Sequence, residues 1–160
     1  MTYMRRRITL TYTYNARRTG AHYTIDNGRH YINHGELCEC IAKDALGYKA
    51  HKASNKLYAQ AHDIADLQAS VKSPRAALTS ARLADNKQDY IDKFFATDTA
   101  KVYIWTQISG EYIEMFFMSP IEFKTFTYMA TYWDKYNKRV RFTSSIRKIA
   151  HCLDIVQSSR

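Results

Sequence analysis

The sequence predicts a single α+β domain in which an N-terminal antiparallel β-meander is followed by a mixed sheet with packed helices. Its length of 160 residues suits one domain. Hydrophobic residues make up 46% of the chain against only 5 Gly and 2 Pro, which favours a compact fold over a disordered one. Strand-like alternation fills residues 1–33, whereas strand and helix patterns alternate over residues 34–108 and again over 109–160. We therefore expect these three segments to build one domain.

Residues 1–33 predict a three-stranded meander. Residues 8–14 alternate threonine with apolar and aromatic side chains, as strands do. Asn27-Gly28 is a strong two-residue hairpin signal, and it joins the predicted strands 21–26 and 29–33.

Arginine is the only basic residue type besides histidine in residues 1–33. Its planar fork suits bidentate contact with phosphates, so we expect these arginines to bind nucleic acid. The alternative is a sheet edge kept soluble by charge. The candidates are Arg5, Arg6, Arg7, Arg17, Arg18 and Arg29.

A helix and a polar loop follow the meander. Asn33 and Glu36 have the spacing of a capping box, and Gly47 is suited to end the helix that begins there. Residues 48–62 show no firm pattern, so they form either a mobile loop or a binding loop. As a binding loop it would use Lys49, Lys52 and Lys56.

Residues 63–73 predict a half-buried strand with two unlike faces. One face would hold Ala65, Leu67, Ala69 and Val71, and the other Asp66, Gln68, Ser70 and Lys72. A carboxylate and a lysine on one strand face form the core of many metal-dependent nuclease sites, where the carboxylate holds Mg²⁺ and the lysine meets the developing charge. The alternative is an ordinary amphipathic strand.

The C-terminal half predicts further elements in regular order. Ser73-Pro74 begins either a short helix or an extended segment over 76–79. The patterns then predict a helix from Asp85, a central strand over 101–108, a partner strand over 111–118, a helix over 120–134, a strand over 139–143 and a helix capped by Ser144-Ser145.

The charge is strongly positive and unevenly distributed. The chain carries 24 Lys+Arg against 15 Asp+Glu, a net +9. Residues 1–83 hold 13 of these cations and 6 of the acids, whereas residues 84–160 hold 11 and 9. Such a balance predicts either a nucleic-acid or nucleoprotein partner or a basic surface that only keeps the protein soluble. It argues against a DNA mimic, which would be acidic.

Cysteine and hydropathy patterns bound the compartment. Three cysteines do not make a disulfide framework, and His34, Cys38 and Cys40 have the wrong spacing for a zinc site, so we expect no resident metal outside a nuclease site. No apolar run approaches the roughly 20 residues that a membrane-spanning helix needs. We therefore expect a cytoplasmic protein without a membrane partner.

Part of this order resembles the restriction-endonuclease-like PD-(D/E)xK fold. In residues 33–108 Lys72 matches the family's lysine, Asp63 or Asp66 its first acid, and Glu36 the glutamate of the preceding helix. Ser70 stands where the second acid belongs. The resemblance implies either a variant endonuclease with Mg²⁺ bound by Asp63 or Asp66, or a degenerate nuclease core kept for binding.

Three functions compete at this stage. The first is a non-enzymatic binder of nucleic acid or of a nucleoprotein complex. By size and composition alone the chain is similar to the small inhibitors, such as anti-CRISPR proteins, by which phages and other mobile elements block a host defence nuclease. The second is a metal-dependent DNA endonuclease that uses Asp66, Lys72 and Glu36. The third is a homo-oligomeric assembly protein joined through aromatic residues of the helix predicted over 120–134, such as Phe126 and Trp133.

Overall fold

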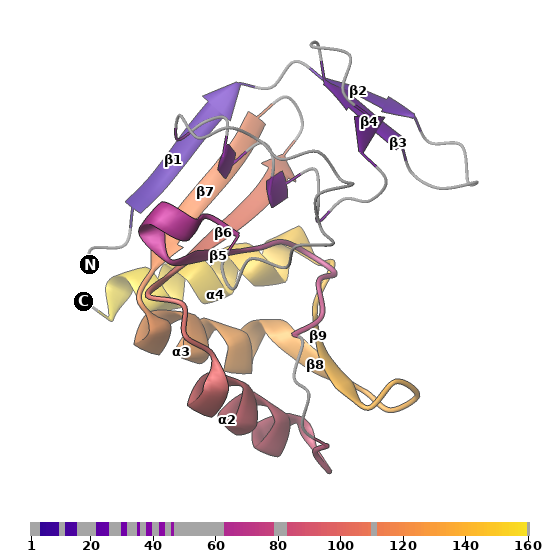
Figure 1. The fold of residues 1–160 in the computed structure, drawn as a ribbon, viewed down its shortest axis with the longest axis vertical. Coiled ribbons are helices and arrows are strands. Elements are labelled where there is room, and N and C mark those ends of the chain that lie inside the picture. Colours follow the sequence, from indigo (N-terminus) through magenta and orange to yellow (C-terminus); the bar gives the residue numbers. More distant parts are fainter. Residues whose placement is uncertain are drawn as a thin grey trace.

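The structure is a computed structural model, and it confirms an α+β domain (Figure 1). It describes residues 4–9, 12–15, 22–25, 30–31, 35, 38–39, 42–43, 46, 63–78, 83–109 and 112–159. None of the helices in these ranges combines the length and apolar character needed to cross a membrane.

The main sheet has four strands in the order β1-β7-β6-β5. These are β1 (Met4–Thr9), β7 (Tyr112–Met118), β6 (Val102–Ser109) and β5 (Ala69–Lys72). The sheet is mixed, because β5 runs parallel to β6 while the other pairs are antiparallel. The prediction of a central strand over 101–108 is confirmed, since β6 pairs on both sides and is apolar on both faces.

The predicted meander exists, but its first strand is placed differently. β2 (Tyr12–Asn15), β3 (His22–Ile25) and β4 (His30–Tyr31) form a separate three-stranded antiparallel sheet. The residues predicted as one strand over 8–14 are divided, because β1 pairs with β7 in the main sheet and β2 pairs with β3. Alternation predicts a strand but not its partner, since a strand's pairing depends on distant parts of the chain.

Three helices cover one face of the main sheet, and their N-termini follow the predicted capping. They are α2 (Lys87–Thr97), α3 (Pro120–Ala130) and α4 (Ile146–Ser158). Ser119 and Glu122 form the reciprocal capping box of α3, and Ser145 caps α4. The α2 cap is Asn86, one residue after the predicted Asp85.

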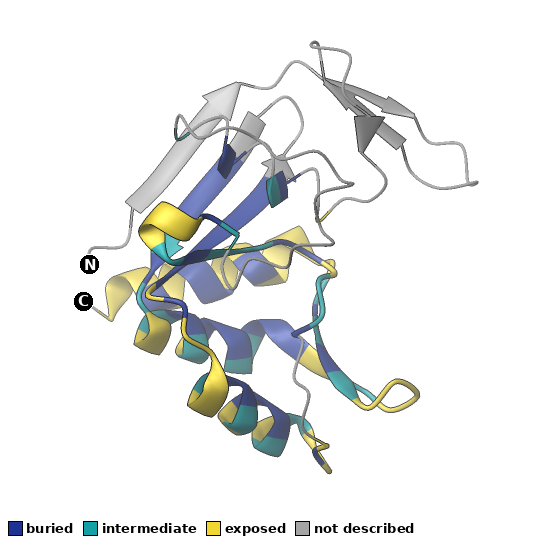
Figure 2. Cartoon of the chain, in the orientation of Figure 1, coloured by how far each residue is buried: buried dark blue, intermediate teal, exposed yellow. Residues whose placement is uncertain are grey.

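The core lies mainly between the main sheet and these helices (Figure 2). Five buried rings form what we call the aromatic layer: Tyr103, Trp105, Phe123, Phe126 and Phe142. Tyr103 stacks on Phe123 with ring centroids 4.3 Å apart, and Trp105 lies 4.9 Å from both Phe126 and Phe142. Burial of each ring contributes about 1.5–3 kcal/mol of hydrophobic stabilisation, so the aromatic layer is a substantial part of the core.

A smaller core covers the opposite face of the sheet. Val102, Ile104 and Met115 pack there with Ile64 and with Ala42. Residues 38–39 and 42–43 are helical, which agrees with the helix predicted after Asn33. The sheet is therefore covered on both faces within the described part of the chain.

The predicted helix over 120–134 is too long. α3 ends at Ala130, and the chain continues as β8 (Thr131–Asp134), which forms a hairpin with β9 (Arg139–Phe142). Thr131 and the two aromatic residues that follow it favour a strand. The Lys87 ammonium donates to the carbonyls of Tyr128 and Thr131 at 2.7 Å each, and these bonds satisfy the end of the helix.

The predicted strand over 63–73 is only half a strand. Ala65–Leu67 forms a 3-10 helix, Gln68 closes it in the left-handed region with φ 49°, and β5 begins at Ala69. Ala69 is buried as predicted, whereas Leu67 is exposed. After Ser73-Pro74 the chain runs beside β9, with an antiparallel bridge from Ala77 to Arg141, so the extended alternative is the correct one.

Candidate nucleic-acid interface

The β8–β9 hairpin, residues 131–142, presents an outer face that is basic and aromatic. We call it the basic hairpin. Tyr132 pairs with Arg141 and Asp134 with Arg139, and directly opposed residues share a face. Tyr132 is 48% exposed, so this face is the outer one.

The inner face attaches the basic hairpin to the core. Val140 and Phe142 are fully buried, and Phe142 belongs to the aromatic layer. Trp133 packs against the ring of Tyr90 with centroids 6.0 Å apart. Backbone bonds from Leu78 to the Val140 carbonyl and from Phe142 to the carbonyl of Ala76 add a third chain segment to the ribbon. The base of the hairpin is therefore fixed while its turn projects from the body (Figure 1).

The charges of the basic hairpin are mostly positive. Residues 131–142 hold four cations, Lys135, Lys138, Arg139 and Arg141, against the single acid Asp134. The Asp134 Oδ2 atom lies 3.7 Å from Arg139 Nε and 4.0 Å from Arg141 Nε. One carboxylate between two guanidiniums orients both and neutralises only one. The three side chains are 15–38% exposed, and ion pairs that reach the solvent contribute little to stability.

A second contact fixes the direction of Arg141. Its Nη1 donates to the backbone carbonyl of Arg75 at 2.8 Å. Arg75 is itself exposed and adopts φ 68°, in the left-handed region that costs a non-glycine residue energy. The backbone of Arg75 thus helps to hold Arg141 in place.

Hydrogen bonds from Asn137 to the Asp134 carboxylate order the turn of the basic hairpin. This carboxylate accepts from the backbone N–H of Asn137 at 3.2 Å and from its side-chain amide at 2.8 Å. These bonds, first the side-chain one, lower the pKa of Asp134 below its ordinary value. Tyr136 stands at the tip and is 99% exposed, between the exposed Lys135 and Lys138.

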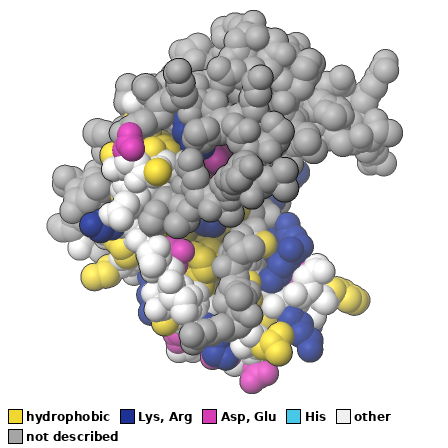
Figure 3. Space-filling view, in the orientation of Figure 1, with side chains coloured by type: hydrophobic (Ala, Val, Ile, Leu, Met, Phe, Trp, Pro, Cys, Tyr) yellow, Lys and Arg dark blue, Asp and Glu magenta, His cyan; other side chains and the backbone are white. Residues whose placement is uncertain are grey.

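The basic hairpin combines cations with exposed rings. Figure 3 shows Lys and Arg side chains on the side that carries the basic hairpin. Guanidinium and ammonium groups bind phosphate oxygens, and exposed aromatic rings stack on bases. The basic hairpin therefore carries both kinds of group that nucleic-acid contacts use.

The predicted nuclease face does not form as expected. Asp66 lies in the exposed 3-10 helix, before the left-handed Gln68, so it is not on a strand face with Lys72. Of the four residues predicted for this face, only Ser70 and Lys72 share a face of β5. Their register partners on β6 are Tyr103 and Trp105. The Lys72 Nζ lies 5.9 Å above the ring of Phe94, toward α2. The shared face of Asp66 and Lys72 is thus a wrong prediction, because a turn replaces the strand between them.

The carboxylate of Asp63 has a structural contact. Its Oδ2 accepts from the backbone N–H of Val71 at 2.7 Å. β5 is an edge strand of the main sheet, so the bond to Asp63 satisfies a Val71 amide that is not paired with β6. Glu36 lies outside the described residues, and within the described ranges no three acidic, histidine or cysteine side chains are grouped to hold a metal ion.

The N-terminal arginines are distributed differently from the prediction. Arg5, Arg6 and Arg7 belong to β1 in the main sheet, not to the meander. Their backbone positions are opposite the buried residues Phe116, Met115 and Glu114 of β7. The predicted binding residues Arg17, Arg18, Arg29, Lys49, Lys52 and Lys56 lie outside the described residues, so their role stays a prediction.

The aromatic residues of the predicted helix face inward more than expected. Phe126 is fully buried in the aromatic layer, and Trp133 is half-buried on β8, not on the helix. Among the described residues of α3, Ile121 is the large apolar side chain that stands clear of the core. The aromatic surface that the assembly hypothesis needs is therefore mostly core.

The sequence patterns did not predict the basic hairpin. The run Lys135-Tyr136-Asn137-Lys138-Arg139 interleaves cations with an aromatic residue, which is a signal of nucleic-acid contact. The hairpin was not predicted because residues 131–134 were predicted to continue the helix.

Comparisons of the chain with protein-family models, with curated proteins and with solved structures found no match.

Proposed function

We propose that this protein is a non-enzymatic nucleic-acid-binding protein whose basic hairpin contacts the phosphate backbone. The observation that carries the proposal is the outer face of the hairpin, where Arg139 and Arg141 stand beside Lys135, Lys138 and exposed tyrosine rings. A positively charged, projecting ribbon is a suitable element for tracking a polyanion.

The rigid base of the hairpin supports the proposal. Val140 and Phe142 are buried, so the outer cations need little ordering when a ligand binds. Cations held in place before binding lose less conformational entropy than those on a mobile loop. The contact of Arg141 with the Arg75 carbonyl adds to this preorganisation.

The net charge supports it in a second way. The whole chain carries +9, so a general attraction to nucleic acid adds to the local one. General attraction predicts that any two cations matter equally, whereas our proposal predicts that those on the hairpin matter most. This difference defines the test.

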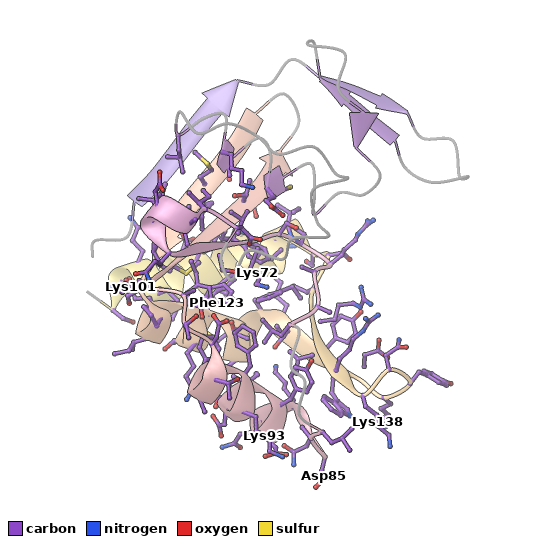
Figure 4. The ribbon with its side chains drawn as sticks, in the orientation of Figure 1. Lys72, Asp85, Lys93, Lys101, Phe123 and Lys138 are labelled. Atoms are coloured by element: carbon purple, nitrogen blue, oxygen red, sulfur yellow. The ribbon has the colours of Figure 1, made fainter. Side chains whose placement is uncertain are left out.

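The test compares two double variants that remove the same charge. Lys135→Gln/Lys138→Gln changes the hairpin, and Lys101→Gln/Lys124→Gln changes exposed or half-exposed lysines elsewhere. Figure 4 places Lys138 well away from Lys101. Binding of labelled oligonucleotides is measured at salt concentrations from about 50 to about 200 mM, a range over which phosphate contacts lose much of their affinity.

We expect the hairpin variant to lose affinity and to flatten the slope of log K against log salt by about 0.7–0.9 for each lysine that contacts a phosphate. The control variant should keep the affinity and the salt slope of the wild type. Equal losses in the two variants would contradict a hairpin site and leave only general attraction.

A second assay tests the absence of catalysis. Supercoiled plasmid is incubated with the wild type and with Asp66→Ala, in Mg²⁺, in Mn²⁺ and in EDTA. Metal-dependent nicking that disappears in the variant would overturn the non-enzymatic part of the proposal and support the nuclease hypothesis. Binding to a nucleoprotein complex and inhibition of a defence nuclease stay predictions, which a pull-down with such a nuclease would test.

A further inference from the structure

We infer that the ligand of the basic hairpin is single-stranded nucleic acid, with the rings of Tyr136 and Tyr132 stacking on unpaired bases. This inference rests on the proposed function and narrows it to a class of ligand. It follows from the exposure of the two rings, from their place among the cations, and from what a duplex can offer to such rings.

Among the aromatic residues whose burial the structure describes, Tyr132 and Tyr136 are the exposed ones. Tyr136 is 99% exposed at the tip of the turn, and Tyr132 is 48% exposed on the outer face. By contrast, Tyr103 in the aromatic layer is 1% exposed. Rings that face water at the surface contribute little to folding, so their position is available for a ligand.

Cations lie next to both rings on the surface where a ligand would bind. Tyr136 lies between Lys135 and Lys138 in the turn, and Tyr132 stands opposite Arg141. A strand bound along the outer face would therefore meet a ring and a cation at the tip, and again nearer the base. Alternating stacking platforms and cations are how proteins bind single strands without reading their sequence.

A duplex would leave the two rings without a partner. Its base faces are covered by neighbouring base pairs, and its grooves present only base edges and sugar–phosphate walls. A β-ribbon can enter a major groove, but it then reads base edges with polar side chains. An extended single strand can direct its phosphates toward the cations and present unpaired base faces to the two rings.

The experiment measures fluorescence anisotropy of a labelled oligothymidylate of about 20 nucleotides and of a duplex of equal length, at one salt concentration. We expect the single strand to bind at least tenfold more tightly. Tyr136→Ala should weaken single-strand binding roughly tenfold, the loss expected for one stacked base, and leave duplex binding unchanged. Tyr136→Phe should bind like the wild type, because it keeps the ring.

One control variant and one variant of the second ring separate stacking from other causes. Ile121→Ala removes a large side chain, 80% exposed, from α3 and should not change binding. Tyr132→Ala should weaken single-strand binding less than Tyr136→Ala, since half of its ring is covered.

The outcomes distinguish this inference from the proposed function. If duplex and single strand bind equally and Tyr136→Ala is harmless, while Lys135→Gln/Lys138→Gln loses binding, the inference falls and the proposed function stands. If neither nucleic acid binds the wild type, both fall. A loss in Tyr136→Phe equal to that in Tyr136→Ala would show that the hydroxyl and not the ring matters, and it would also overturn stacking.

Discussion

The aromatic layer and the basic hairpin use the same residue types for opposite purposes. Tyr103 and Tyr136 are both tyrosines in or beside strands, yet one is buried against Phe123 and the other faces water. What differs is their neighbours along the chain. Tyr103 lies in an apolar strand that is covered on both faces, whereas Tyr136 lies among lysines in a turn. An aromatic residue therefore indicates a core or a ligand contact only together with its surroundings.

The largest expected effect comes from breaking the aromatic layer. Phe126→Ala should lower the free energy of unfolding by about 3–5 kcal/mol, because it removes a buried ring and leaves a cavity beside Trp105. Denaturant unfolding followed by circular dichroism measures the change. Tyr136→Ala is the matched variant in the basic hairpin, and it should change stability by less than about 0.5 kcal/mol.

Comparable losses in the two variants would contradict the division into a core region and a ligand-facing region. If Phe126→Ala does not fold, Phe126→Leu keeps most of the apolar volume and should show a smaller loss in the same direction.

A smaller effect is expected where the two regions join. Lys87 connects α2 to the start of the hairpin through the carbonyls of Tyr128 and Thr131. Lys87→Met keeps much of the side chain's length but removes its donors, so it should cost about 1–3 kcal/mol of stability. The loss should also loosen β8, and hydrogen exchange of the hairpin amides measures this directly. Unchanged exchange together with lost stability would show that Lys87 supports only the helices.

Much of the fold could be predicted because its signals are local. The capping box at Ser119 fixed the start of α3, and the two-sided apolar pattern of β6 indicated a central strand before any partner was known. The end of α3 was missed because aromatic residues suit both a helix and a strand. The helix end is satisfied in part by distant groups, because Lys87, more than forty residues away in the chain, donates to the carbonyls of Tyr128 and Thr131, and the backbone N–H of Thr143 donates to that of Ala130.

The candidate site was harder to predict because it depends on that missed boundary. The cations near residue 138 are visible in the sequence, but their common outer face exists only once β8 and β9 pair. The predicted Asp66–Lys72 face failed for a similar reason. A single left-handed residue, Gln68, turns the chain between them, and period-two alternation gives no sign of it.

The smallest expected effect concerns pH and the turn of the basic hairpin. The pKa of Asp134 is lowered by its bonds from Asn137, so ionisation of this carboxylate stabilises the folded turn above its ordinary value of 3.8. That contribution is lost as the pH falls through the lowered value, because the protonated acid accepts these bonds less well. The amide signals of Asn137 in NMR should therefore shift below pH 3.8 in the wild type and not in Asp134→Asn. If they shift alike in both, the turn is ordered by its attachment to the core and not by Asp134, and the presentation of Tyr136 depends on the buried face of the hairpin alone.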